Sequence, residues 1–211
     1  MNTPHQDPEL RAVDLECVRG DRVLFSRLHF DLAAGHILFV EGANGAGKTS
    51  LLRILAGLSP PADGEILWRG SAISRNRAAY CADMTYVGHG TGLKAELTPF
   101  ENLRIWTRLA GVAAEDGAIR DALDRMGLAH SHDIQTRTLS AGQRQRTALT
   151  RLLLATARCW ILDEPFTALD VTGIERVREL IDAHTRRGGM AVMTSHQALP
   201  PAHNVIRLVL G

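Results

Sequence analysis

The sequence has 211 residues, enough for one domain with a sizeable core, and its 24 basic and 23 acidic residues give a formal net charge of +1. This balance argues against a highly charged nucleic-acid-binding surface. No apolar stretch reaches the roughly 18 residues of a membrane span, and the polar segment Met1–Glu9 is unlike a signal peptide. We therefore expect a soluble intracellular protein. Its cysteines, Cys17, Cys81 and Cys159, lie far apart in the sequence and are expected to be buried free thiols.

The first part of the chain predicts several strands and one helix. Between residues 23 and 32 apolar side chains alternate with polar ones, which indicates a half-buried strand, and the run at 12–18 is its expected antiparallel partner. A mostly apolar run at 36–40 indicates a buried strand instead. The predicted elements are strands at residues 12–18, 23–32, 36–40, 65–68 and 84–87 and a helix at 50–56.

The pattern then becomes helical up to about residue 157. Thr98-Pro99-Phe100-Glu101 is a capping box with proline at the first helical position, and Gly111 is expected to end this helix. Strands and helices alternate afterwards, which predicts a mostly parallel α/β sheet. We expect one domain over residues 1–211, with a helical subdomain inserted at 90–140. The remaining predicted elements are helices at residues 98–111, 114–126, 141–157 and 171–187 and strands at 159–162, 190–194 and 205–210.

The stretch from Gly42 to Thr49 fits the phosphate-binding pattern G-x-x-x-x-G-K-[ST] and lies between a predicted strand and a predicted helix, as that motif requires. Its glycines allow backbone N–H groups to converge on a triphosphate, and the helix N-terminus adds partial positive charge. Lys48 is expected to reach the outer phosphates and to act in catalysis, and the Thr49 hydroxyl to hold Mg²⁺. The predicted nucleotide contacts here are Gly42, Ala43, Asn44, Gly45, Ala46, Gly47, Lys48, Thr49 and Ser50.

Two carboxylates end a later apolar strand, because Asp163 and Glu164 follow the run that begins at Cys159. A buried strand can bring Asp163 beside the phosphate loop, where it would help to hold Mg²⁺, and Glu164 can then polarise the attacking water. The alternative is an acidic pair that faces solvent at a strand end. The following Pro165 and the order of the motifs favour the catalytic interpretation.

A serine-led helix start provides a second candidate anion site. In the stretch Leu139-Ser140-Ala141-Gly142-Gln143 the serine can cap a helix, and the small residues allow the close backbone approach that suits a γ-phosphate. An ordinary N-cap would explain the serine but not the small residues. His196 follows the strand that ends at Thr194, and this position favours a catalytic contact with the γ-phosphate over a structural role. The predicted nucleotide contacts of the helix start are Ser140, Gly142 and Gln143.

The phosphate loop, LSAGQ, the acidic strand, Asp170 and His196, in this order, resemble the nucleotide-binding domain of an ABC ATPase over roughly residues 10–210. The resemblance implies an α/β P-loop NTPase core of ABC type with a mostly parallel sheet, an N-terminal antiparallel β part and a helical subdomain. It also implies ATP and Mg²⁺ as ligands and a head-to-tail homodimer, in which the phosphate loop of one copy faces the LSAGQ helix of the other. Two anion-binding surfaces that cannot meet within one chain are best used across a symmetric pair.

Two positions depart from the usual ABC pattern. Where such domains carry an aromatic residue that stacks on adenine, this chain has Arg19 before Gly20, and a guanidinium plane can also stack on a base. The Mg²⁺-contacting glutamine usually found after the strand ending at Val87 is replaced by His89. Its imidazole can meet a metal-bound water or a nucleotide oxygen. We therefore predict Arg19 as a nucleotide contact and His89 as part of the metal site.

Several local stretches resemble one ABC family in particular. Tyr86-Val87-Gly88-His89, Trp160–Ala168 and Thr194-Ser195-His196-Gln197 are similar to the CcmA family, the ATP-binding subunits of the cytochrome c maturation (haem exporter) complex. Many members have glutamine after the histidine, where this chain has Gly90. The short C-terminus with Pro200-Pro201 also resembles that family.

The CcmA resemblance implies a peripheral subunit on the cytoplasmic face of a bacterial inner membrane, with CcmB, CcmC and CcmD as membrane-spanning partners and no nucleic acid. ATP turnover would drive haem export or release of a haem-loaded chaperone. One alternative is the ATPase of an unrelated ABC importer or exporter. A non-transport ABC protein is less favoured, because the sequence lacks paired domains and sustained heptads. The apolar residues available to a membrane partner, most of them expected to be buried, are Leu93, Leu97, Phe100, Trp106 and Leu109.

Overall fold

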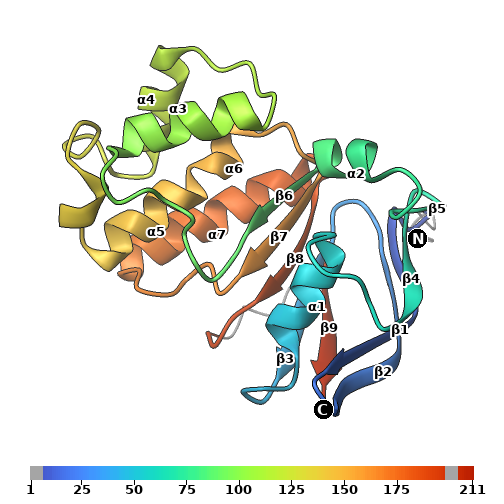
Figure 1. Ribbon diagram of the computed structural model, residues 1–211. Coiled ribbons are helices and arrows are strands. Elements are labelled where there is room, and N and C mark those ends of the chain that lie inside the picture. Colours follow the sequence, from blue (N-terminus) through green and yellow to red (C-terminus); the bar gives the residue numbers. More distant parts are fainter. Residues whose placement is uncertain (1–6, 198–203) are drawn as a thin grey trace.

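The computed structural model describes residues 7–197 and 204–211, which form two β-sheets and a group of helices (Figure 1). The expectations for residues 1–6 and for Pro200-Pro201 lie outside the described residues. The strands are β1 (Leu10–Arg19), β2 (Arg22–Leu32), β3 (Ile37–Gly42), β4 (Asp63–Trp68), β5 (Ser71–Ala72), β6 (Met84–Val87), β7 (Cys159–Asp163), β8 (Met190–Thr194) and β9 (Val205–Leu210). The helices are α1 (Lys48–Leu55), α2 (Arg77–Asp83), α3 (Pro99–Leu109), α4 (Asp116–Arg125), the 3₁₀ helix η1 (Thr136–Thr138), α5 (Ala141–Leu149), α6 (Arg151–Leu154) and α7 (Val171–Arg186).

The smaller sheet is antiparallel, in the order β2-β1-β4-β5. The alternation along β2 is visible in its burial, because Leu32 is fully buried and the neighbouring Asp31 is exposed. The predicted pairing of β1 with β2 is confirmed, and it brings Arg19 opposite Arg22 at the turn end of the hairpin. Because α1 lies between this sheet and the larger one (Figure 1), the hairpin is held close to the phosphate loop.

The larger sheet is parallel, in the order β6-β7-β8-β3-β9, and its central strands β7 and β8 are buried on both faces. Alternate residues enter two different cores: Trp160 and Leu162 of β7 pack with the helices α3 to α7, whereas Cys159 and Ile161 pack with α1 and the antiparallel sheet. Strands with two buried faces are expected to be continuously apolar. The C-terminal ends of β3, β6, β7 and β8 meet at one edge, which is where open parallel sheets bind ligands.

The helices α3 and α4 lie outside α5 and α6 (Figure 1). At the start of α3 the predicted capping box is present, because Thr98 Oγ1 accepts from the Glu101 N–H at 3.2 Å and the Glu101 carboxylate accepts from the Thr98 N–H at 2.9 Å. Phe100 and Leu103 share one core with the parallel sheet. Of the apolar residues considered for a partner, only Leu109 is largely exposed, at 84%, and the unpredicted Ile105 is 46% exposed one turn earlier.

Three details differ from the sequence predictions. The short elements β5 and α2 were not predicted, and the helix expected at 141–157 is divided at Thr150 and ends at Leu154 because Ala155 is extended on the way to β7. The expectation that all cysteines are buried is wrong for Cys81, which lies on the outer face of α2. Among the described helices, none combines the length and the apolar character needed to cross a bilayer.

Candidate active site

The phosphate loop connects β3 to α1 at the C-terminal edge of the parallel sheet. Gly47, which caps α1, has a φ of +98°, and a Cβ atom there would lie 3.1 Å from the Leu24 side chain of the hairpin. Glycine is therefore required both by the backbone conformation and by the close approach of the hairpin. Lys48 Nζ donates to the carbonyl oxygens of Gly42 at 2.6 Å and Ala43 at 3.2 Å. Its positive charge is thus held at the loop.

Asp163 ends β7 directly beside Thr194, the last residue of β8. Its side chain is almost completely buried, with 2% exposure. One carboxylate oxygen, Oδ1, accepts a hydrogen bond from the Thr194 hydroxyl at 2.9 Å, whereas the buried Oδ2 has no hydrogen-bond partner among the described residues. The pKa of Tyr86 on β6 is raised, first by burial and then by the charge of Asp163. A buried acceptor without a partner is costly, so Oδ2 is an open position for a ligand.

Glu164 begins the turn after β7 and has a φ of +54°, which is unusual for a residue with a side chain. Its N–H donates to Thr194 Oγ1 at 3.0 Å, and its carboxylate accepts from the His196 N–H at 3.1 Å. The His196 imidazole Nε2 lies 3.6 Å from the other carboxylate oxygen. The ends of β7 and β8 thus hold the glutamate carboxylate beside the predicted histidine.

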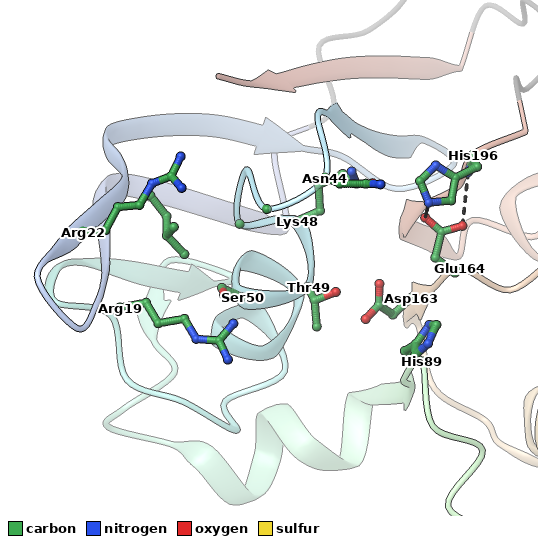
Figure 2. A pocket seen from close by; sticks show the side chains of 13 residues that line it. Arg19, Arg22, Asn44, Lys48, Thr49, Ser50, His89, Asp163, Glu164 and His196 are labelled. Carbon is green, nitrogen blue, oxygen red and sulfur yellow. Dashed lines mark hydrogen bonds and ion pairs between the residues drawn. The ribbon is translucent and has the colours of Figure 1, made fainter.

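A cavity of about 520 Å³ opens between the phosphate loop, the β1–β2 hairpin and the ends of β6 and β7. Figure 2 shows the Thr49 hydroxyl and the Asp163 carboxylate facing each other in it, with His89 beside Asp163. The predicted residues that line it are Arg19, Asn44, Gly45, Gly47, Lys48, Thr49, Ser50, His89, Asp163, Glu164 and His196. Gly42, Ala43 and Ala46 belong to the loop but are not among the lining residues. The lining residues Arg22 and Leu24 were not predicted, although the expected hairpin could have indicated that Arg22 lies opposite Arg19.

The serine-led helix start lies outside this cavity. Ser140 Oγ accepts from the Gln143 N–H at 3.1 Å, and the Gln143 side-chain oxygen accepts from the Ser140 N–H at 2.8 Å. These two bonds form a capping box at the start of α5. A Cβ atom on Gly142 would lie 2.6 Å from the Ala168 carbonyl oxygen, so a small residue here is needed by the chain's own packing. Within one chain, Ser140, Gly142 and Gln143 are not brought together with the other predicted site residues.

The oxygen donors in the cavity are of the kind that Mg²⁺ prefers, namely the Thr49 hydroxyl and Asp163 Oδ2. In the described ranges no three or more His, Cys, Asp or Glu side chains gather into a metal-binding cluster. Mg²⁺ commonly keeps several waters and is held by one or two protein ligands together with substrate phosphates. The site therefore fits a magnesium ion that arrives with a nucleotide.

The fold and this cavity together define the nucleotide-binding domain of a P-loop ATPase. The family model described as ABC transporter matches residues 25–167. Among solved structures, a putative ABC transporter ATP-binding protein from Pyrococcus furiosus is similar with a TM-score of 0.82 and 24% identity, covering 95% of this chain and 96% of that one. A dimeric ATP-binding cassette bound to ADP and Pi is similar with a TM-score of 0.79 and 20% identity, over 89% of this chain and 88% of its own. The predicted fold class is confirmed.

Curated relatives show to which branch of the ABC transporter family the chain belongs. A protein of Methylococcus capsulatus is 61% identical, and the match covers 92% of this chain and 93% of that protein. A protein of Dechloromonas aromatica is 50% identical, and the match covers 96% of this chain and 100% of that protein. Both are named cytochrome c biogenesis ATP-binding export protein CcmA. The chain belongs to the ABC transporter family and, within it, to the CcmA proteins. The predicted family is therefore confirmed.

Proposed function

We propose that this chain binds ATP with Mg²⁺ in the cavity beside the phosphate loop and hydrolyses it to power an ABC complex of cytochrome c biogenesis. The observation that carries this proposal is the convergence, in one cavity, of the phosphate loop, the Glu164 carboxylate and Asp163 Oδ2, which has no hydrogen-bond partner in the part of the chain that the structure describes. A structural acidic pair at a strand end would not need a buried oxygen left without a hydrogen bond.

Each residue of the cavity has a role that follows from its surroundings. Lys48, now bound to two loop carbonyls, can exchange one of these partners for an outer phosphate, because a charge-assisted hydrogen bond is stronger than a neutral one. Thr49 and Asp163 would hold Mg²⁺, which when bound supplies charge compensation for the phosphate oxygens. Glu164 would accept the proton of the attacking water, with its carboxylate held by the His196 N–H.

The second half of the site would come from another copy of the chain. The first-turn N–H groups of Ala141 and Gly142 have no acceptor in their own helix, and the helix N-terminus favours a negative charge. In one chain this start lies outside the cavity that holds Lys48 and Asp163. A head-to-tail homodimer would bring α5 of one copy against the phosphates bound by the other, forming two equivalent sites.

The membrane role is proposed from the CcmA relatives. The chain would act as a peripheral subunit on the cytoplasmic face of the inner membrane, with CcmB, CcmC and CcmD as partners, and would couple ATP turnover to haem export or to release of a haem-loaded chaperone. We propose residues 90–140 as the helical subdomain that contacts these partners. The exposed apolar pair Ile105 and Leu109 on α3 supports this, because apolar side chains on a surface favour a protein contact.

Two measurements test the proposal. The purified chain, alone and with co-expressed membrane subunits, should hydrolyse ATP only when Mg²⁺ is present. Affinity capture of the tagged chain from detergent-solubilised membranes should recover CcmB, and the double variant Ile105→Ser/Leu109→Ser should recover less of it without loss of ATP binding. Capture of the membrane subunits of another transporter in place of CcmB would show that the biogenesis role is wrong.

A further inference from the structure

The Thr194 hydroxyl forms hydrogen bonds with both carboxylate residues of the cavity, Asp163 and Glu164. Thr194 is the last residue of β8, is completely buried with 0% exposure, and does not itself line the cavity. Its Oγ1 lies 2.9 Å from Asp163 Oδ1 and 3.0 Å from the backbone nitrogen of Glu164. One hydroxyl group is therefore shared by the residues proposed to hold the metal and to activate water.

The hydrogen count fixes the direction of both bonds. The Glu164 backbone can only donate, so the hydroxyl oxygen accepts from it, and the single hydroxyl hydrogen is then available for Asp163 Oδ1. This leaves Asp163 with one oxygen occupied by Thr194 and with Oδ2 buried and unpartnered among the described residues. The hydroxyl thus determines which carboxylate oxygen is presented to a ligand.

The same hydroxyl holds the backbone of Glu164 in its unusual conformation. A φ of +54° is uncommon for a residue with a side chain and persists only where neighbouring structure stabilises it. The Glu164 N–H donates to Thr194 Oγ1, and the Glu164 carboxylate accepts from the His196 N–H. Hydrogen bonds therefore hold both the backbone and the side chain of Glu164. Both partners come from β8 or the residues that directly follow it, so the position of the glutamate depends on that strand end.

We propose that Thr194 is a positioning residue that aligns Asp163 Oδ2 toward Mg²⁺ and Glu164 toward the attacking water. The inference rests on the proposed ATPase function and adds to it a requirement for a hydroxyl group at this position. The hydroxyl of the neighbouring Ser195 is used elsewhere: its Oγ accepts from the Gln197 N–H at 2.8 Å, whereas the Glu164 N–H donates to Thr194.

The test compares Thr194→Val, which keeps the shape but lacks the hydroxyl, with Thr194→Ser, which keeps the hydroxyl but lacks the methyl group. Mn²⁺ bound with a non-hydrolysable ATP analogue is titrated by electron paramagnetic resonance, alongside kcat and KM for Mg²⁺-ATP. Since loss of a group that orients a metal ligand commonly costs about 10- to 100-fold in metal affinity or activity, we expect a loss of that size in Mn²⁺ affinity and kcat for the valine variant. The serine variant should stay within about twofold of the wild type in all three quantities. In the valine variant KM for Mg²⁺-ATP should rise together with the loss of Mn²⁺ affinity, because the metal ion is bound as part of the Mg²⁺-ATP complex.

The control is Thr85→Val, which removes a buried threonine hydroxyl from β6 at a position that does not line the cavity. Circular dichroism confirms folding, and the pair Thr194→Ala and Thr194→Ser gives the same hydroxyl comparison if the valine variant does not fold. Equal Mn²⁺ affinity and kcat in wild type and Thr194→Val would overturn the inference, as would equal losses in the serine and valine variants. Failure of the wild type to bind Mn²⁺ with nucleotide would instead overturn the proposed function on which the inference rests.

Discussion

Two regions that would contact the same triphosphate are built in opposite ways. In the cavity, the buried Asp163 Oδ2 has no hydrogen-bond partner among the described residues, and the exposed side chains of Arg19 and Arg22 line the opposite wall. At the start of α5, in contrast, the side chains of Ser140 and Gln143 satisfy each other's backbone N–H groups. The cavity therefore contains a buried acceptor that a ligand can satisfy, whereas the start of α5 is stable without a ligand.

This difference suggests an order of events. A nucleotide that enters the cavity of one chain with its metal ion gains strong partners, because Lys48 is positively charged and the buried Asp163 Oδ2 has no hydrogen-bond partner among the described residues. The helix start offers mainly the first-turn N–H groups and the charge of the helix end, which are weaker attractions that act within one turn. We infer that the nucleotide binds first to the cavity and that the second copy of the chain closes on it afterwards. The substitutions below separate these two steps.

The largest effect is expected for Glu164→Gln, which should leave the cavity intact and remove only the base. Glutamine can still accept the His196 N–H through its side-chain oxygen, so the local geometry is kept. Because a general base commonly contributes about 10²- to 10⁴-fold, we expect a loss of that order in kcat with little change in ATP affinity. Light scattering should then detect an ATP-dependent dimer that does not dissociate. Normal turnover in this variant would remove Glu164 from the catalytic role.

The next largest effect is expected for Lys48→Ala, which weakens the cavity itself. A hydrogen bond to a charged group contributes about 1.5–3 kcal/mol, so the Kd for ATP should rise by about 10- to 100-fold in isothermal titration. The matched control is Lys94→Ala, which removes the other lysine of the chain at a position away from the cavity. Unchanged ATP affinity in Lys48→Ala would contradict the assignment of this residue to the phosphates.

A smaller effect is expected from the helix start, and here two substitutions separate capping from phosphate contact. Ser140→Ala removes the cap, which should lower stability by about 1 kcal/mol and also reduce hydrolysis. Ser140→Asp keeps a good capping side chain but adds a negative charge toward a phosphate. If α5 faces a triphosphate in the dimer, the aspartate variant should hydrolyse ATP more slowly than the alanine variant although it unfolds at a higher temperature. Full activity in Ser140→Asp would mean that the serine is only a cap.

Much of the fold could be predicted because its periodic patterns are strong. The alternation in β2 and the continuous apolar runs of β7 and β8 follow directly from sheets with one or two buried faces. The helix α2 could not be predicted, because Tyr80 is its only buried residue. Its position depends on distant partners: the Tyr80 hydroxyl donates to the Leu55 carbonyl at 2.7 Å, and the ring packs against Trp68.

The site residues also fall into two groups: some belong to local sequence motifs, and others are positioned by pairing between strands. The phosphate loop and the pair Asp163 and Glu164 are local motifs, so the sequence alone could indicate them. The roles of Arg22 and Thr194 depend on which residues neighbouring strands bring together, and a one-residue change of register would alter them. Gly142 matches a motif, but its close contact with the Ala168 carbonyl becomes evident only in three dimensions.

The smallest effect is expected at Arg19, which lines the cavity and is predicted to contact the nucleotide. Exposed cation–π contacts contribute about 0.5–1 kcal/mol, so Arg19→Ala should weaken ATP binding by about two- to fivefold. Arg22→Ala measures the contribution of the neighbouring guanidinium to ATP affinity, and Arg108→Ala on α3, away from the cavity, serves as the control.

Inorganic tripolyphosphate, which lacks a base, distinguishes the two possible contacts of Arg19. If the guanidinium stacks on adenine, Arg19→Ala should weaken binding of ATP and leave that of tripolyphosphate unchanged. Equal weakening of both would mean that Arg19 contacts the phosphates, and that another group must hold the base.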